Sequence, residues 1–170
     1  MLAGVLDGND AARLNSALVR GERIAVGVGA SYDNTQRGPS LFVVSATPSS
    51  GKSAAELEQA LRRELGRVVS EGVSDAELKR VKAQLVAGQV FERDSMVFQA
   101  MQIGSLEAAG YTHKAIDTML RKLQDVTPAQ VQEVARKYLV DDRLTIAILD
   151  PQPLDGRKPA APPPGLPHAQ

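Results

Sequence analysis

Residues 46–53, with the sequence Ala-Thr-Pro-Ser-Ser-Gly-Lys-Ser, are the stretch of this chain that looks most like a binding or catalytic motif. Their spacing fits the relaxed pattern of a phosphate-binding loop, in which backbone N–H groups cradle the phosphates and a lysine neutralises them. The stretch lies between a strand pattern and a helix pattern, and a later apolar run ends in Asp150, which could supply a carboxylate to magnesium. One hypothesis is therefore a nucleotide-binding module through Gly51, Lys52 and Ser53.

Three features argue against phosphate binding. Ala46 stands where the loop needs glycine, and Pro48 removes an amide donor from the loop itself. The fold that uses this loop is a parallel sheet with a strand after each helix, whereas no strand pattern is found between Ser53 and Asp142. A polar turn followed by a capping box from Ser53 to Glu56 accounts for the same residues.

The chain offers few side chains for metal or nucleophilic chemistry. It has two histidines, His113 and His168, far apart in sequence, and no cysteine. Neither zinc-protease pattern, His-Glu-x-x-His or His-x-x-Glu-His, can be written, and there is no Gly-x-Ser-x-Gly elbow for a serine nucleophile. The sequence therefore predicts no catalytic residue and no metal site, with His113 on the surface at the start of a helix.

The charged residues are interpreted as structural. Twenty basic residues balance twenty acidic ones, interleaved along helices, which indicates neither a nucleic-acid nor an anionic-membrane partner. No run approaches the roughly 20 apolar residues of a membrane span. Tyr32, at the end of a strand pattern, is also interpreted as structural. Pairs of opposite charge at helical spacing predict solvated faces, formed by Glu56, Glu58, Arg62, Arg63, Glu64 and Arg67 on one helix and Glu77, Lys79, Arg80 and Lys82 on the next.

Two strand patterns organise the chain. Residues 24–33 and 40–48 alternate with the period of two that a pleated sheet requires. Their connector, Asn34–Pro39, is too short for a parallel crossover, so the pair predicts an antiparallel hairpin. Helical patterns dominate the remainder, and the predicted fold class is therefore α+β, an antiparallel sheet covered by helices.

Capping signals place the helices around this hairpin. Ser53 with Glu56, Ser74 with Glu77, and Thr127-Pro128 with Gln130 mark three helix starts. The helix over 96–109 is apolar on more than one face, which predicts burial between layers. The predicted helices are 2–6, 11–20, 53–71, 74–91, 96–109, 113–124 and 127–138, followed by a last strand over 144–149.

We predict one α+β domain over residues 1–150 and a Pro-rich disordered tail over 151–170. The opening run Leu2–Leu6 reads as the end of a helix, so we expect the domain to be truncated at its N-terminus. A sheet edge exposed by truncation seeks a partner, and a homodimer of the isolated chain is therefore expected.

Taken in order, these segments resemble the C-terminal domain of the pitrilysin/insulinase-type zinc metallopeptidases. The resemblance covers nearly all of residues 2–150, and its specificity comes from the order and spacing of individually weak motifs. The matching stretches are Ala12–Val19, the strand from Ile24 to Tyr32, the second strand to Pro48, Glu71–Gln84, Phe91–Ser95, Thr127–Leu139 and the closing segment to Pro151.

The resemblance implies a peptidase built from two related halves, in the fold of the mitochondrial processing peptidase. In that family the catalytic half carries His-x-x-Glu-His, binds zinc and activates water, and the other half lacks the metal motif and closes over a peptide. This chain resembles the second half. We therefore expect it to be inactive by itself, to hold no cofactor, and to form the lid and substrate-chamber wall opposite a metal-binding domain.

The partners implied by the resemblance are a metal-bearing N-terminal domain or subunit of the same peptidase, which would hold the zinc, and a peptide substrate. The resemblance also favours a bacterial periplasm or envelope. The alternatives are a non-catalytic assembly or scaffold subunit of the same fold and, from another class, the nucleotide-binding module described above.

One stretch departs from the family pattern. Many members place an arginine and a tyrosine before the first strand, in sequences resembling Arg-Glu-x-Arg-Gly-Leu-Ala-Tyr, to hold the substrate backbone and stabilise the developing oxyanion. In this chain Val26 stands at the tyrosine position and Val19 at the leading arginine position, with Arg20 one step away. No substrate contact is therefore assigned to a residue.

Overall fold

The sheet is a single antiparallel hairpin. The computed structural model describes residues 1–92 and 94–151, and within them β1 (Ala25–Tyr32) pairs with β2 (Phe42–Pro48). The register runs from Tyr32 opposite Phe42 to Ala25 opposite Pro48. The predicted hairpin and the α+β class are confirmed. The connector between the strands is longer than expected, because both strands are shorter than the alternating sequence patterns that predicted them.

A β-bulge changes which side of the sheet the first strand residues face. The pairing shifts between Ala25 and Gly27, so one extra residue interrupts the alternation. Ala25 is consequently buried and Val26 is 63% exposed, although Val28 and Ala30 pack toward the core as the period of two predicts. The sequence pattern placed Val26 on the same face as Val28 and Ala30, and the bulge makes that prediction wrong.

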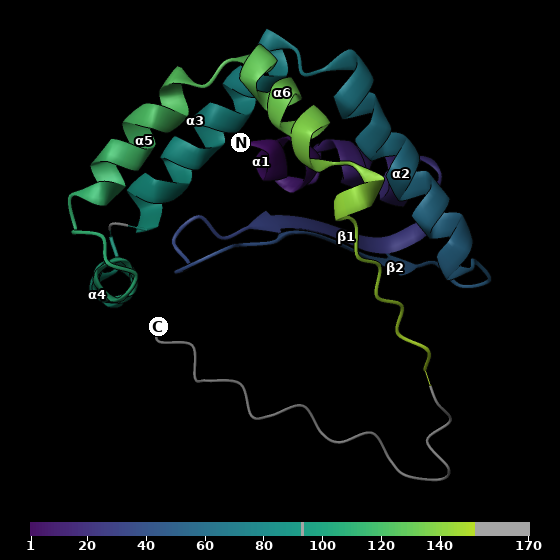
Figure 1. Cartoon of the computed structure of the whole chain (residues 1–170), viewed down its shortest axis with the longest axis horizontal. Coiled ribbons are helices and arrows are strands. Elements are labelled where there is room, and N and C mark those ends of the chain that lie inside the picture. Colours follow the sequence, from purple (N-terminus) through teal and green to yellow (C-terminus); the bar gives the residue numbers. More distant parts are fainter. Residues whose placement is uncertain (93, 152–170) are drawn as a thin grey trace, which may run out of the picture.

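Four helical elements cover one face of the hairpin (Figure 1), and a fifth, α3, also contributes to their core. They are α1 (Leu2–Asp7), the π-helix η1 (Asn15–Gly21), α2 (Ala54–Glu71) and α6 (Pro128–Tyr138). The core is aliphatic, and aromatic residues make up only 4% of the sequence. Its most deeply buried side chains are Leu6, Leu14, Leu18, Val5 and Val68.

The predicted helix over 11–20 has a different form in the structure. Its residues from Asn15 onward make π-helical turns, and the Glu22 N–H donates to the Ala17 carbonyl, five residues back, at 2.8 Å. The wider turn still directs Leu14 and Leu18 into the core, as the sequence predicts. The location of the apolar face was therefore predictable, although the type of helix was not.

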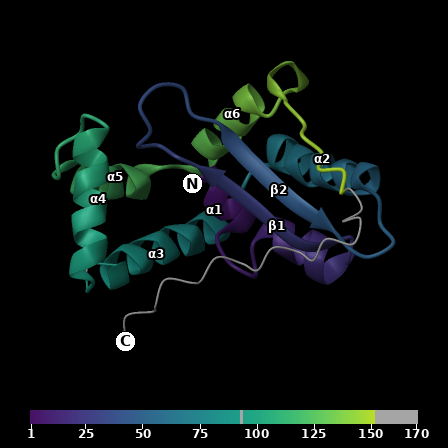
Figure 2. The ribbon, with the colours of Figure 1, turned by 90° about the horizontal axis from the view of Figure 1, so that it is seen from below.

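The remaining helices extend away from this body. The helix α3 (Asp75–Glu92) leads from the body to α4 (Met96–Ala108) and α5 (Ala115–Asp125), and Figure 2 shows all three on one side of the hairpin. We call α4 and α5, with their connection, the arm. Lys82 Nζ donates to the Gln124 carbonyl at 2.6 Å and ties the arm to α3. No described helix combines the length and apolarity that a membrane span needs.

Predicted caps are present at the helix starts. The Ser53 hydroxyl accepts from the Glu56 N–H, and the Thr127 hydroxyl accepts from the Gln130 N–H, each within a complete capping box. The Ser74 hydroxyl accepts from the Glu77 N–H at 3.2 Å. These bonds satisfy orphan amide groups, so local sequence is enough to fix these boundaries.

Two predictions about individual segments are wrong. The helix α4 is not buried between layers, because Met96, Val97 and Met101 are 86%, 71% and 67% exposed, and Leu106 alone is buried among its side chains. The run Leu144–Leu149 is extended without strand pairing, after the short 3-10 helix η2 (Asp141–Arg143). The predicted tail, apart from Pro151, lies outside the described residues.

Gly72 ends α2 in a conformation that other residues rarely adopt. Its φ of 76° and ψ of −154° lie in a region that is essentially reserved for glycine, and a Cβ added there would meet the Gln132 side chain at 3.1 Å. We expect Gly72→Ala to lower the free energy of unfolding by about 1–3 kcal/mol. Urea denaturation of the variant and of the wild type would measure the loss.

Gly66, inside α2, is the matched control for Gly72. A Cβ at Gly66 would meet no heavy atom within 4 Å. Gly66→Ala should therefore raise the free energy of unfolding by about 0.5–1 kcal/mol, since alanine is the better helix former. Similar destabilisation by both substitutions would contradict the role given to the Gly72 backbone.

Candidate functional site

The polar groups of the phosphate-loop candidate bond to one another. Ser53 is the N-cap of α2, its backbone N–H donates to Glu56 Oε2 at 2.8 Å, and its hydroxyl lies 2.9 Å from the same oxygen. Lys52 Nζ lies 3.8 Å from Glu56 Oε1. Hydrogen bonds from the Ser53 backbone and side chain hold the pKa of Glu56 below its ordinary value. A carboxylate thus sits at the helix N-terminus, where a phosphate would have to bind.

The described histidine lies on the surface, as predicted. The His113 N–H donates to Glu107 Oε1 at 3.1 Å, and its ring Nδ1 lies 3.9 Å from the same oxygen. His168 lies outside the described residues. Within residues 1–92 and 94–151, no three His, Cys, Asp or Glu side chains come together in a way that could hold a metal ion.

The residues at the family's substrate-binding positions do not form a site. Val26 is exposed on β1, and Val19 is partly buried against the core. The Arg20 guanidinium donates to the Asp10 carbonyl and to the Ser16 hydroxyl, within its own region of the chain. Tyr32 is 54% exposed at the end of β1. The structure brings none of these side chains together.

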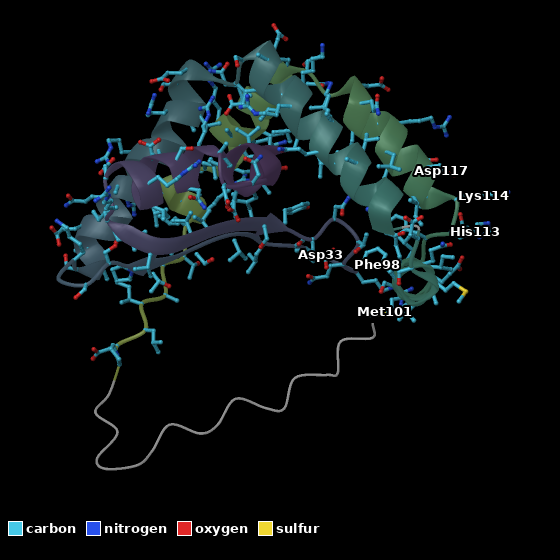
Figure 3. The ribbon with its side chains drawn as sticks, turned by 180° about the vertical axis from the view of Figure 1, so that it is seen from behind. Asp33, Phe98, Met101, His113, Lys114 and Asp117 are labelled. Atoms are coloured by element: carbon cyan, nitrogen blue, oxygen red, sulfur yellow. The ribbon has the colours of Figure 1, made fainter. Side chains whose placement is uncertain are left out.

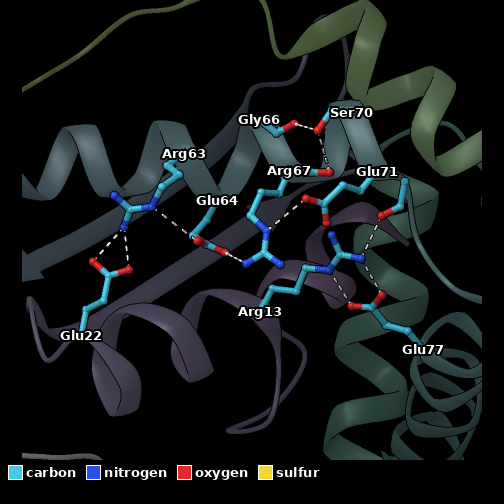
Figure 4. A network of polar contacts seen from close by, with 10 residues as sticks. Arg13, Glu22, Arg63, Glu64, Gly66, Arg67, Ser70, Glu71 and Glu77 are labelled. Carbon is cyan, nitrogen blue, oxygen red and sulfur yellow. Dashed lines mark hydrogen bonds and ion pairs between the residues drawn. The ribbon is translucent and has the colours of Figure 1, made fainter.

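A partly buried ion pair joins segments far apart in sequence (Figure 4). The Arg13 guanidinium donates from Nε and Nη2 to the two oxygens of Glu77, both at 2.7 Å, and Nη2 also donates to the Gly72 carbonyl at 2.8 Å. Hydrogen bonding to Arg13 lowers the pKa of Glu77, and the same bond raises the pKa of Arg13. The arrangement fixes α3 to the N-terminal segment, which is a structural role.

Glu64 is the buried charge that the sequence did not reveal. Only 4% of this residue is exposed, and its oxygens lie 3.8 Å from Arg63 Nε and 3.5 Å from Arg67 Nη1. Helical spacing correctly predicted the surface pair Glu58–Arg62, and Arg67 also lies 3.5 Å from Glu71. It assigned Glu64 to the same solvated face, and that assignment is wrong because η1 and the N-terminal segment pack close to this part of α2.

One pocket, of about 430 Å³, opens between the hairpin loop, α3 and the arm. Its lining carries no charged side chain, and its polar groups are amides and hydroxyls such as Asn34, Gln89 and Gln102. Gln102 Nε2 donates to Gln89 Oε1 at 3.2 Å across the rim. Figure 3 shows Asp33 of the loop and Phe98 of α4 at the same end of the molecule. The main apolar lining residues are Leu85, Phe98, Met101, Leu106, Met119 and Leu120.

The second candidate surface is the side of the hairpin that the helices leave uncovered, which we call the open sheet face. It carries Val26, Val43, Ser45 and Thr47, all exposed. Gly27 and Gly29 lie opposite Thr47 and Ser45, so the surface has little relief. Among the described residues, neither this face nor the lining of the pocket brings a nucleophile together with an activating base.

A family model described as the Peptidase M16 inactive domain matches residues 1–85. No curated protein matches the chain.

Solved structures share the fold. A candidate zinc protease from Bordetella pertussis Tohama I superposes with a TM-score of 0.71 at 21% identity, over 84% of this chain and 77% of that one. The inactive peptidase domain of a candidate zinc protease from Bordetella parapertussis superposes with a TM-score of 0.72 at 22% identity. The match covers 83% of this chain and 75% of that one. A protease from Helicobacter pylori superposes with a TM-score of 0.75 at 18% identity. The match covers 84% of this chain but only 34% of that protein.

The resemblance noted in the sequence is confirmed by the family match, which covers half of the chain. The structural matches extend the shared fold beyond residue 85 to more than four-fifths of the chain. The segment that was matched by sequence contains the hairpin, α1, η1 and α2, whereas α6, which also contributes to the core, lies outside it. The chain belongs to the family of Peptidase M16 inactive domains.

Proposed function

We propose that this chain forms a wall of the substrate chamber of a zinc metalloendopeptidase, closing as a lid opposite a metal-bearing domain. The observation that carries the proposal is the one-sided covering of the sheet, with the helices of the body above the hairpin and the open sheet face below it (Figure 1). A two-layer half with one bare, flat face is suited to enclosing an extended peptide against a second half.

The chemistry would then be divided between the two halves. In the metal-bearing domain, zinc would activate a water molecule and a general base would accept its proton as the water attacks the peptide carbonyl. The present chain would contribute a surface without charge or nucleophile, so that a peptide is positioned and shielded from solvent. We accordingly propose that zinc and the peptide substrate bind in the assembled enzyme, with the zinc held by the metal-bearing domain.

The first test is the zinc content and activity of the native assembly, captured from its source cells with an antibody against this chain. We expect zinc and a peptidase activity that a chelator abolishes, whereas the purified chain alone should cleave nothing. A zinc-free native assembly would contradict the proposal and favour a scaffold subunit. Cleavage by the contaminant-free chain alone would contradict the division of roles.

Charge placed on the open sheet face should impair catalysis in that assembly. Val43→Glu puts a carboxylate on the surface proposed to contact peptide, and we expect kcat/KM to fall about tenfold, a loss of about 1.4 kcal/mol in transition-state binding. Zinc content and thermal stability should stay unchanged. Lys79→Glu, exposed on α3, is the control and should leave kcat/KM unaltered. Equal effects of both variants would exclude the open sheet face as the chamber wall.

A further inference from the structure

The apolar face of α5 does not join the main core. Its members, Ile116, Met119, Leu120 and Leu123, follow the helical spacing i, i+3, i+4 and i+7, yet no residue of α5 is buried. All four side chains line the pocket of about 430 Å³ instead. An amphipathic helix normally buries such a face against a neighbour. The pocket therefore occupies the place where that neighbour would pack.

Three other segments complete the walls of this pocket. Phe98, Met101 and Leu106 enter the lining from α4, and Leu85 enters it from α3. Figure 2 shows α4 crossing the ends of α3 and α5 that lie away from the body. The hairpin loop contributes Asn34 on the remaining side. The pocket is thus bounded by segments that are far apart in the sequence.

Polar contacts between these segments fix the shape of the pocket. Gln102 Nε2 donates to Gln89 Oε1 at 3.2 Å and joins α4 to α3. The bond from Lys82 joins α3 to α5, and Asn34 Nδ2 lies 4.0 Å from Met119 Sδ, which links the hairpin loop to α5. A preformed space of about 430 Å³ lies within the range of small-molecule sites, about 300–1,000 Å³.

The polar part of the lining determines which ligands can enter. None of the described lining residues is charged, and the polar ones are the amides Asn34, Gln89 and Gln102 with the hydroxyls Thr35 and Ser105. An ionised ligand would lose its hydration here without gaining a counter-ion. A side-chain amide both donates and accepts hydrogen bonds, so it matches an amide on the ligand in both directions. These groups favour an uncharged carboxamide.

The apolar part of the lining favours an aromatic ring. Phe98 offers its own ring for offset-stacked or edge-to-face contact. Met101 and Met119 offer thioethers, which contact aromatic rings favourably and adapt to their shape. Met101 is 67% exposed and Phe98 is 38% exposed, so a ring packed against them would remove apolar surface from water.

We propose that this pocket binds an uncharged carboxamide that carries an aromatic group. The carboxamide would pair with the amides and hydroxyls of the lining, and the ring would pack against Phe98, Met101 and Met119. An extended polypeptide would bring more main-chain groups than a few neutral side chains can satisfy, which favours a small ligand. The site uses no residue of the open sheet face, so this inference goes beyond the proposed function and does not rest on it.

The four methionines of the chain make binding at this site observable. Met101 and Met119 line the pocket, whereas Met1 and Met96 do not. The whole 170-residue chain, labelled with carbon-13 at the methionine methyl groups, is titrated with phenylbutyramide and followed by NMR. We expect saturable shifts of the Met101 and Met119 methyl signals, with a Kd of about 1 mM or below, as befits a small fragment. The Met1 and Met96 signals should stay in place.

Two probes with the same carbon skeleton test the requirement for an uncharged ligand. Phenylbutyrate carries a negative charge and phenylbutylamine a positive one. We expect each to bind about tenfold more weakly than phenylbutyramide, because neither finds a counter-ion in the lining. Equal affinities for the three probes would overturn the proposal.

A pair of variants tests the amide groups of the lining. Gln102→Leu nearly keeps the size of the side chain and removes its amide, and we expect it to weaken the binding of phenylbutyramide about fivefold. Gln99→Leu is the matched control, since Gln99 is exposed on the same helix and lies outside the lining. It should bind as the wild type does. Equal weakening by both substitutions would contradict the proposal.

Two further results would overturn the assignment of the pocket. One is the absence of any saturable shift with phenylbutyramide, or a shift at Met96 as large as that at Met101. The other is a movement of the Met101 and Met119 signals that grows with protein concentration when no ligand is present. That behaviour would assign the pocket to a second copy of the chain.

Discussion

Leu18→Ala should lower the free energy of unfolding by about 2–5 kcal/mol, the cost of a leucine cavity that a packed core cannot refill. Leu18 has no exposed surface and lies in η1, within the cluster that joins η1 to α1, α2 and α6. This loss is a large fraction of the total free energy of unfolding, which is only about 5–15 kcal/mol for a small domain. Urea denaturation monitored by circular dichroism would give the difference.

The same substitution at an exposed leucine serves as the control. Leu41, in the hairpin loop, is 80% exposed, and Leu41→Ala should change the free energy of unfolding by no more than about 0.5 kcal/mol. A small effect at Leu18, comparable with that at Leu41, would mean that η1 does not pack as the structure shows.

Arg13→Met should destabilise the chain by about 1–3 kcal/mol at pH 7, because Glu77 and the Gly72 carbonyl lose a charge-assisted donor while remaining partly buried. Methionine keeps much of the apolar stem and removes the charge. Arg62→Met is the matched control, since Arg62 also contacts carboxylates, at Glu58 and Asp141, but on the surface. Its effect should be much smaller.

The loss at Arg13 should also depend on pH. The pKa of Glu77 in the folded chain is lowered by Arg13, so its contribution is fully present above the unfolded value of about 4.3 and disappears as the pH falls through the lower folded value. The difference in stability between wild type and Arg13→Met should therefore begin to shrink below about pH 4, and the bond from Arg13 to the Gly72 carbonyl should leave a remainder. A difference that stays constant from pH 7 to pH 3 would show that the arginine does not act through the charge of Glu77.

The sequence predicted the features that depend on local chemistry. Ser53, Ser74 and Thr127 cap helices because the interacting groups lie within three residues. The hairpin was predictable for a similar reason, since a short connector limits how two neighbouring strands can pair. The contact of Arg13 with Glu77 joins residues 64 positions apart, and no periodicity in the sequence points to it.

Other features were missed because tertiary context decides them. Val26 is exposed through the bulge between Ala25 and Gly27, and a one-residue insertion in a ladder leaves no mark in apolar alternation. The pattern in α4 predicted burial correctly for Leu106 and wrongly for Met96 and Met101, because apolarity does not say which neighbour covers a face.

The arm also has a consequence for how the stability of this protein can be measured. Leu106 is the buried side chain of α4, and α5 has none, so the described arm residues contribute little to the main core. Such a unit opens by itself, at a lower free energy than the body requires. A spectroscopic probe attached near Met101 would thus follow a sub-global transition, and its midpoint would not coincide with that of a probe near Leu18. One unfolding curve would then describe only part of the molecule.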